Sequence, residues 1–281
     1  MRVGISNGII AAEADTHGAE LQSVVCRGKE RLWQNESGEW SGHAPVLFPV
    51  CGKCSVRIGG REYDPGRHGF AKGSEFSIAE RRKNAVTFEL KPSAETKAGY
   101  PFDFVFRVRY SLIDARLRIA YEIENPAEDT LYFSCGAHES FLLERPLGEY
   151  ELRFPKSERF LSLLHDGNGC LTGETLGFGE GTRLALPEEF LTEGRTVIFG
   201  TLRSRSLLLC ERGGNALVRV TFGGFPNLLL WRGGTAPFLC IEPWHNLPDD
   251  GTKSDFSERE GIIALAAHEK KRFLREIEYL M

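Results

Sequence analysis

LRIAYEIE (residues 117–124) alternates an apolar side chain with a small or charged one at every second position. Successive side chains of a strand point to opposite faces of the sheet, so this period of two predicts a strand with one buried and one solvated face. Turn-forming residues bound similar runs at 86–90, 104–110, 151–154, 206–210 and 217–222. The pattern favours antiparallel β structure.

Helical periodicity is scarce: single turns are expected at 187–191 and 255–261, and loops at 145–149 and 166–179. The 31 Gly, 13 Pro and 19 Phe among 281 residues also favour turns and strands. The sequence shows no βαβ alternation, which argues against a parallel sheet. It also contains no linker that would divide the chain into domains. We therefore expect an all-β fold, an antiparallel sandwich or barrel, that forms one large domain over residues 1–281.

The formal net charge is −4, and the acidic and basic residues are dispersed. The nearest candidate for a basic patch, residues 270–272, is too short for a nucleic-acid or membrane site and is expected to be a solvated edge of the last strand. The sequence contains no stretch of about 18 apolar residues, the length that would span a membrane, and the N-terminus lacks the apolar run of a signal peptide. We expect a cytoplasmic protein with neither nucleic-acid nor membrane partners.

Seven cysteines, an odd number among apolar neighbours, are expected to be buried, reduced thiols. Cys51 and Cys54 form a CxxC that would suit half a zinc site or a redox pair, but no second ligand pair follows, so we interpret it as coincidence. The glycines at 177–181 lack the lysine of a phosphate-binding loop. No metal or cofactor is expected.

Three ionisable residues stand out as candidates for chemistry. His68 is followed by Gly69, and glycine permits close backbone approach to a ligand. His138 follows the small residues 136–137, and Glu242 lies in an apolar run, where a carboxylate needs a partner. Each residue taken alone also suits a structural role.

Four motifs together resemble those of the aldose 1-epimerase (galactose mutarotase) superfamily, and its LacX-type branch in particular. They are HGFA at 68–71, YPFDF at 100–104, GAHESF at 136–141 and CIEPWHNLPD at 240–249. Weaker similarity at 18–23, 44–49, 156–161 and 236–238 follows in the same order. The resemblance implies a galactose mutarotase-like β-sandwich, a large twisted antiparallel domain. It also implies that the protein interconverts the α and β anomers of an aldohexose without metal or cofactor.

Residue by residue, the resemblance implies that His138 is the general acid, that Glu242 is the general base and that His68 contacts the sugar. It also assigns substrate binding to Lys53, Lys72, Trp231 and His245, and it suggests that His245, just after the base, orients Glu242. Ring opening needs a base at the anomeric hydroxyl and an acid at the ring oxygen. With ordinary pKa values of about 4.3 and about 6.5, a glutamate and a histidine suit these two roles near neutral pH.

Two departures from the family pattern leave the substrate open. Lys53 and Lys72 stand where relatives usually have arginine, and Glu139-Ser140 replaces the usual Pro-Ala. A phosphorylated sugar would need a cluster of cations, which Lys53, Lys72, Arg57 and Arg67 would provide if they converge. A hexose-6-phosphate mutarotase and a catalytically silent sugar-binding protein therefore remain alternatives, and either a monomer or a homodimer is expected.

Overall fold

Strand β11 (Arg116–Glu124) confirms the alternation that predicts it. In the computed structural model, which describes residues 1–252 and 254–280, Leu117, Ile119 and Tyr121 are buried in the core. On the solvent face, Arg107 of the neighbouring strand forms ion pairs across the sheet. Its partners are Glu122 at 3.0 Å, Glu124 at 2.9 Å and Glu89 at 2.7 Å. One face of these strands is thus apolar and the other is charged.

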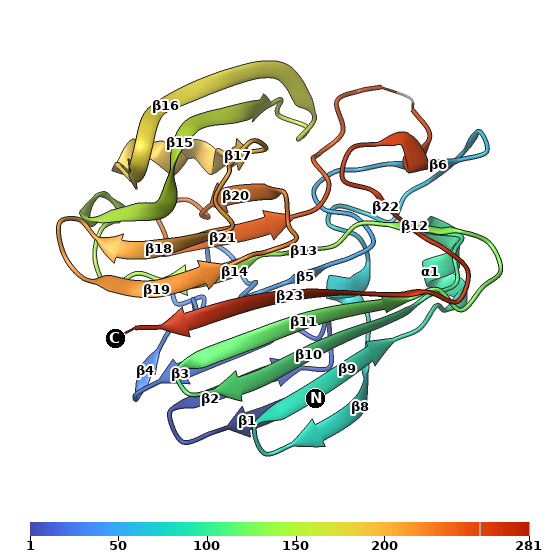
Figure 1. Ribbon diagram of the computed structural model, residues 1–281, viewed down its shortest axis with the longest axis horizontal. Coiled ribbons are helices and arrows are strands. Elements are labelled where there is room, and N and C mark those ends of the chain that lie inside the picture. The colour runs from blue at the N-terminus through green and yellow to red at the C-terminus, as the bar shows by residue number, and fades with distance from the viewer. Residues whose placement is uncertain (253, 281) are drawn as a thin grey trace.

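One large, strongly twisted antiparallel sheet dominates the molecule (Figure 1). Its strands lie side by side in the order β5 (Val46–Leu47), β13 (Gly136–Ala137), β21 (Phe238–Trp244), β20 (Asn227–Trp231), β17 (Val197–Phe199), β15 (Tyr150–His165), β18 (Ser206–Glu211), β19 (Ala216–Thr221), β23 (Lys270–Tyr279), β11, β10 (Val105–Ile113), β9 (Ala85–Leu90) and β8 (Ser77–Arg82). Two further strands extend it: β14 (Glu139–Leu142) pairs with β21, and β16 (Leu171–Ala185) pairs with β15.

A second sheet, with the order β1 (Arg2–Ser6), β2 (Ile10–Asp15), β3 (Leu21–Cys26) and β4 (Lys29–Glu30), packs on the β8–β11 end of the large one. Figure 1 shows it behind strands β9 and β10. The two sheets share one apolar core, to which Val3, Val24, Phe88 and Phe106 contribute. This is a β-sandwich, one of the two architectures that the alternating pattern allows.

The remaining elements are short. Two small antiparallel pairs complete the strands: β6 (Val56–Ile58) and β7 (Arg61–Tyr63) form a hairpin, whereas β12 (Leu131–Phe133) pairs with β22 (Ile263–Leu265), which is distant in the sequence. The helical segments are η1 (Ala71–Gly73), α1 (Ala94–Gly99), η2 (Leu147–Glu149), η3 (Glu188–Gly194) and η4 (Phe256–Glu258). The helical turns expected at 187–191 and 255–261 are confirmed as η3 and η4. Helix α1 was not predicted, although Ser93 and Thr96 form a reciprocal capping box at its start.

The loop predicted at 166–179 is wrong from residue 171 onward, where β16 begins. Together, β15 and β16 form a long hairpin that projects at the top of Figure 1. Within the part of the chain that the structure describes, strand β16 pairs only with β15, so most of its side chains are exposed and the apolar alternation is missing. Its glycines accompany three register shifts, as glycine often does at β-bulges.

The basic run at 270–272 is exposed at the start of the last strand, β23, as expected, although this strand lies inside the sheet between β11 and β19. All seven cysteines are free thiols, and six of them are buried, while Cys170 is half-buried. Within the described ranges, every helix is too short or too polar to cross a membrane.

Candidate active site

The register of the large sheet brings the two principal candidates together. Gly136 of β13 lies opposite Trp244 of β21, and counting two residues along each antiparallel strand places His138 opposite Glu242. On the other side of β21, Glu242 pairs with Leu229. Directly opposite residues share one face of the sheet. Side chains more than a hundred residues apart therefore form one row across the strands.

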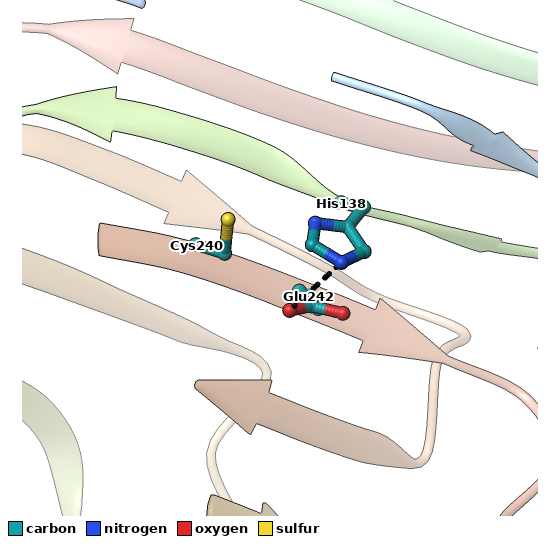
Figure 2. Close-up of side chains that lie close together, drawn as sticks. All are labelled: His138, Cys240 and Glu242. Carbon is teal, nitrogen blue, oxygen red and sulfur yellow. Dashed lines mark ion pairs between the residues drawn. The ribbon is translucent and has the colours of Figure 1, made fainter. Parts of the chain in front are cut away.

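The imidazole of His138 and the carboxyl group of Glu242 face each other (Figure 2). His138 Nε2 lies 3.4 Å from Glu242 Oε1, and the two side chains are 10% and 2% exposed. Among the described residues, neither His138 Nδ1 nor Glu242 Oε1 has a hydrogen-bond partner. Buried polar atoms are nearly always hydrogen-bonded in native proteins, so two such atoms in one place indicate where a polar ligand can bind.

Burial shifts both pKa values toward the neutral forms. Desolvation raises the pKa of Glu242 well above its usual value, and the nearby Glu139 carboxylate adds to the effect. Desolvation lowers the pKa of His138 to about 4, and Lys72 acts in the same direction. The ordinary values expected from the sequence are thus wrong at both groups, because neither side chain is exposed to bulk water.

His68 is held by its backbone in a tight turn. Its own φ of 65° and the φ of 72° at Gly69 are left-handed, and a Cβ on Gly69 would lie 2.1 Å from the carbonyl oxygen of Phe48. The Gly52 N–H donates to His68 Nδ1 at 3.1 Å. In the neutral ring Nε2 therefore carries the proton and is a donor. Desolvation holds the pKa of His68 well below its usual value, which favours that neutral ring.

Aromatic rings surround His138. Trp40 stacks on its imidazole at 5.0 Å between centroids, and Trp231 meets it edge-on at 5.6 Å. The ring of His68 lies 5.6 Å away, also edge-on. Trp40 was not singled out by the sequence, because its segment has no regular alternation. Its position is fixed by the indole N–H of Trp33, which donates to the Trp40 carbonyl at 2.8 Å.

One open cavity of about 500 Å³, a size typical of small-ligand sites, is lined by Trp40, His68, His138, Trp231 and Glu242. Lys53, Arg67 and Lys72 also line it, and within the described ranges none of the three forms an ion pair with a carboxylate. Further lining residues that the sequence did not indicate are His17, Glu20, His165, Thr196, Ile198 and Leu229. The cavity combines an apolar floor, an acid–base pair and cations at its wall.

Two residues proposed for the site lie outside this cavity. His245 follows β21 on the opposite face, where its ring packs 4.4 Å from both Phe225 and Phe273. It does not contact Glu242 in the way that an orienting residue would. Arg57 does not line the cavity either, so the phosphate cluster considered from the sequence comprises Lys53, Lys72 and Arg67.

The two departures Glu139 and Ser140 make specific contacts. Both oxygens of Glu139 accept hydrogen bonds from the guanidinium of Arg275, at 2.6 and 2.8 Å, behind the sheet. Ser140 Oγ donates to the carbonyl of His43 at 2.5 Å, in the segment that carries Trp40. A proline and an alanine would make neither contact, so this chain anchors the strand after His138 in its own way.

One group of side chains has the donor types of a metal site. Cys240 lies two residues before Glu242 on β21, and its sulfur, a nitrogen of His138 and an oxygen of Glu242 all lie within 4.8 Å of one another. Figure 2 shows the three side chains converging. Cys240 itself is fully buried and does not line the cavity.

The chain is similar to known proteins over most of its length. A family model described as aldose 1-epimerase matches residues 1–253. The chromosomal and plasmid forms of protein LacX from Lactococcus lactis subsp. lactis are each 33% identical over 267 residues, which is 88% of this chain and of each relative.

Two crystal structures share the fold closely. A galactose mutarotase-like protein from Lactobacillus casei has a TM-score of 0.91 and 28% identity over 99% of both chains. A galactose mutarotase related enzyme from Lactobacillus acidophilus has a TM-score of 0.91 and 27% identity, over 100% of this chain and 98% of that one. The sandwich is thus of the galactose mutarotase-like type, and the chain belongs to the aldose 1-epimerase family.

Proposed function

We propose that this protein is an aldose 1-epimerase that interconverts the α and β anomers of a free aldohexose by opening and closing the ring at C1. The observation that carries the proposal is a contact in the cavity, where Glu242 Oε1, which forms no hydrogen bond among the described residues, lies 3.4 Å from Nε2 of His138. A proton acceptor and a proton donor so close together can serve the two adjacent oxygens at one anomeric carbon.

In the forward step Glu242 accepts the proton of the anomeric hydroxyl, and the electron pair of that O–H bond forms the C1=O1 double bond. The C1–O5 bond breaks, its electron pair goes to O5, and His138 donates a proton there. Rotation about C1–C2 presents the other face of the aldehyde. In the return step His138 takes the proton from the O5 hydroxyl, O5 attacks C1, and Glu242 returns its proton to O1.

The bound sugar itself prepares the charged forms of the pair. Burial favours neutral Glu242 and neutral His138 in the open cavity. A sugar hydroxyl that donates to Oε1 stabilises the carboxylate, and hydrogen bonding to the charged form moves a carboxyl pKa down. The proton then passes to His138. The two arrangements hold the same number of protons, so the exchange needs no proton from solvent.

Neighbouring groups position the ring. His68 presents a neutral Nε2–H donor for a sugar hydroxyl, and Trp231 offers an aromatic face for the C–H groups of the sugar. We place the enzyme in the cytoplasm, since free thiols suit a reducing compartment. It would act there as a monomer or a homodimer on a small sugar, without a nucleic-acid or membrane partner.

Polarimetry of freshly dissolved α-D-galactose and α-D-glucose tests the reaction. The protein is expected to accelerate the approach to the equilibrium rotation in proportion to its concentration. If no hexose and no hexose 6-phosphate mutarotates faster than in buffer, while equilibrium dialysis shows that a sugar binds, the silent binding protein is correct and the enzyme proposal fails.

A second substrate class has its own support in the cations of the cavity wall. Lys53, Arg67 and Lys72 line the cavity and form no ion pair with any described carboxylate, so they can bind an anionic substituent such as a phosphate. A hexose-6-phosphate mutarotase is therefore the alternative. The same assay with glucose 6-phosphate and galactose 6-phosphate decides between the two.

For the phosphate alternative, Lys53→Met and Lys72→Met should raise the KM for the 6-phosphate and leave the KM for the free hexose much less affected. Rising salt concentration should weaken the phosphate reaction only. Equal kcat/KM values for the free and phosphorylated sugar, unchanged in both variants, would exclude a dedicated phosphate subsite.

A further inference from the structure

Strand alternation places a thiol beside the acid–base pair. Cys240 and Glu242 are two residues apart on β21 and therefore project from the same face, where His138 meets them from the adjoining strands. One ligand atom from each residue lies within 4.8 Å of the other two. A thiol, an imidazole and a carboxylate are together the donors that select zinc or a similar thiophilic ion rather than magnesium or calcium.

One of the proposed ligand atoms has no hydrogen-bond partner among the described residues. This atom is Glu242 Oε1, and the residue is 1% exposed. Zinc binds nitrogen and carboxylate oxygen at about 2.0–2.2 Å, so a tetrahedral ion holds two such ligands about 3.3 Å apart. The observed separation of Nε2 and Oε1 is 3.4 Å. These two atoms already have the spacing of ligands on one ion.

The charges also balance. A neutral imidazole, a carboxylate and a thiolate around a divalent cation sum to zero, which is the condition for burying an ion at low cost. The other carboxylate nearby, Glu139, is already compensated by Arg275 and adds no net charge. The cavity that admits the sugar reaches His138 and Glu242, so an ion has a path to the pair.

We propose that His138, Cys240 and Glu242 form an inhibitory site for a thiophilic divalent cation, with Zn²⁺ as the expected ion, that occupies the acid–base pair and excludes the sugar. The binding part stands on the geometry alone. The inhibitory part rests on the function proposed above, because it requires that His138 and Glu242 perform the reaction.

Cobalt(II) tests the binding part without any assay of activity. Added to the metal-free protein under reducing, anaerobic conditions, Co²⁺ should give a thiolate-to-cobalt charge-transfer band and the visible bands of a tetrahedral ion, and Zn²⁺ should abolish both. The bands should be absent in Cys240→Ser, Cys240→Ala and Glu242→Gln. Cys210→Ala, which changes another buried cysteine on β18, should retain them.

Circular dichroism identifies variants that fail to fold, and the three independent substitutions keep the test decisive if one does. The affinity for Zn²⁺, measured by competition with a chromophoric chelator, should fall by at least about tenfold in Cys240→Ala, because even the loss of an outer partner of a metal ligand has that effect. An unchanged affinity in a folded Cys240→Ala protein, or no thiolate band in the wild type, overturns the proposal.

Mutarotation then tests inhibition. Zn²⁺ should raise the apparent KM of the wild type with little change in kcat, and the same Zn²⁺ concentration should have little effect on folded Cys240→Ala, relative to its own metal-free rate. Cobalt bands together with inhibition that sugar does not relieve would overturn the competitive mechanism. Cobalt bands without any mutarotation would refute the enzyme function and leave the metal site intact.

Discussion

His138 and Glu139 are neighbours in the chain, but each belongs to a different buried pair. On one face of the sheet, His138 meets Glu242 at 3.4 Å, and each of the two side chains keeps a polar atom without a partner. On the other face, Glu139 and Arg275 are joined by two hydrogen bonds of 2.6 and 2.8 Å. Both pairs are buried, so burial does not separate their roles. Hydrogen bonding between the partners does. In the satisfied pair both oxygens of Glu139 are bonded to Arg275, so the pair stabilises the fold even though Arg275 Nε forms no hydrogen bond among the described residues. In the unsatisfied pair Glu242 Oε1 forms no hydrogen bond, and the pair lies ready for a ligand.

Glu242→Gln should have the largest effect, on the unsatisfied pair. The amide cannot accept the proton of the anomeric hydroxyl, so the enzyme-catalysed rate of mutarotation should fall by about 10²–10⁴-fold. The protein should stay folded, since the amide has nearly the shape of the carboxylic acid. Polarimetry measures the rate and circular dichroism the fold, and a Gln variant as fast as the wild type would exclude Glu242 as the base.

Arg275→Met should act in the opposite way on the satisfied pair. It leaves the Glu139 carboxylate buried without a partner, and breaking such a pair typically costs about 3–5 kcal/mol of the free energy of unfolding. Urea denaturation followed by tryptophan fluorescence measures the loss. Lys29→Met is the matched control: it breaks the ion pair with Glu144, whose partners are 61% and 63% exposed, and should cost at most about 1 kcal/mol.

A double variant separates the lost contact from the stranded charge. Glu139→Met combined with Arg275→Met removes both charges, so it should be more stable than Arg275→Met alone. Tyr121, whose hydroxyl accepts a hydrogen bond from Arg275 at 3.2 Å, loses that partner in both variants. If the double variant is no more stable than the single one, the stranded carboxylate is not what destabilises Arg275→Met.

The pH dependence of stability should distinguish Glu242 from an ordinary glutamate. Burial raises the pKa of Glu242 in the fold, so above the unfolded value of 4.5 the folded protein binds more protons than the unfolded chain and loses stability as pH rises. Glu242→Gln lacks this term. The variant should therefore gain on the wild type by up to about 1.4 kcal/mol per pH unit above pH 4.5, until the folded pKa is passed. Urea unfolding of both proteins between pH 4.5 and 7.5 measures the gap, and a constant gap contradicts the raised pKa.

Much of the fold could be predicted from the sequence where alternation is strong. The runs at 117–124, 86–90 and 206–210 all lie in strands, because one face of each packs on the core. Alternation fails at β16, whose two faces are both largely exposed, so residues 171–179 resembled a loop. The pairing of strands distant in sequence was equally hidden, since it depends on contacts that no local pattern records.

The site was predictable by residue type but not by arrangement. Motifs indicated His68, His138 and Glu242, while the register that sets His138 opposite Glu242 appears only once β13, β14 and β21 are paired. The convergence of Lys53 and Lys72 on one cavity was likewise open. A signal for Arg275 did exist: it occupies the apolar phase of β23, in step with Phe273 and Ile277, which indicates a buried charge in need of a partner.

Trp40 gives the smallest expected effect and tests where the unsatisfied pair ends. Its indole stacks on His138 at 5.0 Å and meets Trp231 edge-on at 5.3 Å, so it belongs to the wall of the cavity and not to the proton transfer.

An aromatic pair contributes about 0.5–1.5 kcal/mol beyond its buried area, so Trp40→Ala should raise the KM for the sugar by about 2–12-fold, with a smaller change in kcat. Trp40→Phe, which keeps an aromatic face, should recover most of the loss. A large fall in kcat in Trp40→Ala, restored by Trp40→Phe, would instead mean that stacking holds His138 in its catalytic orientation, and the acid–base pair would then have to include the ring that covers it.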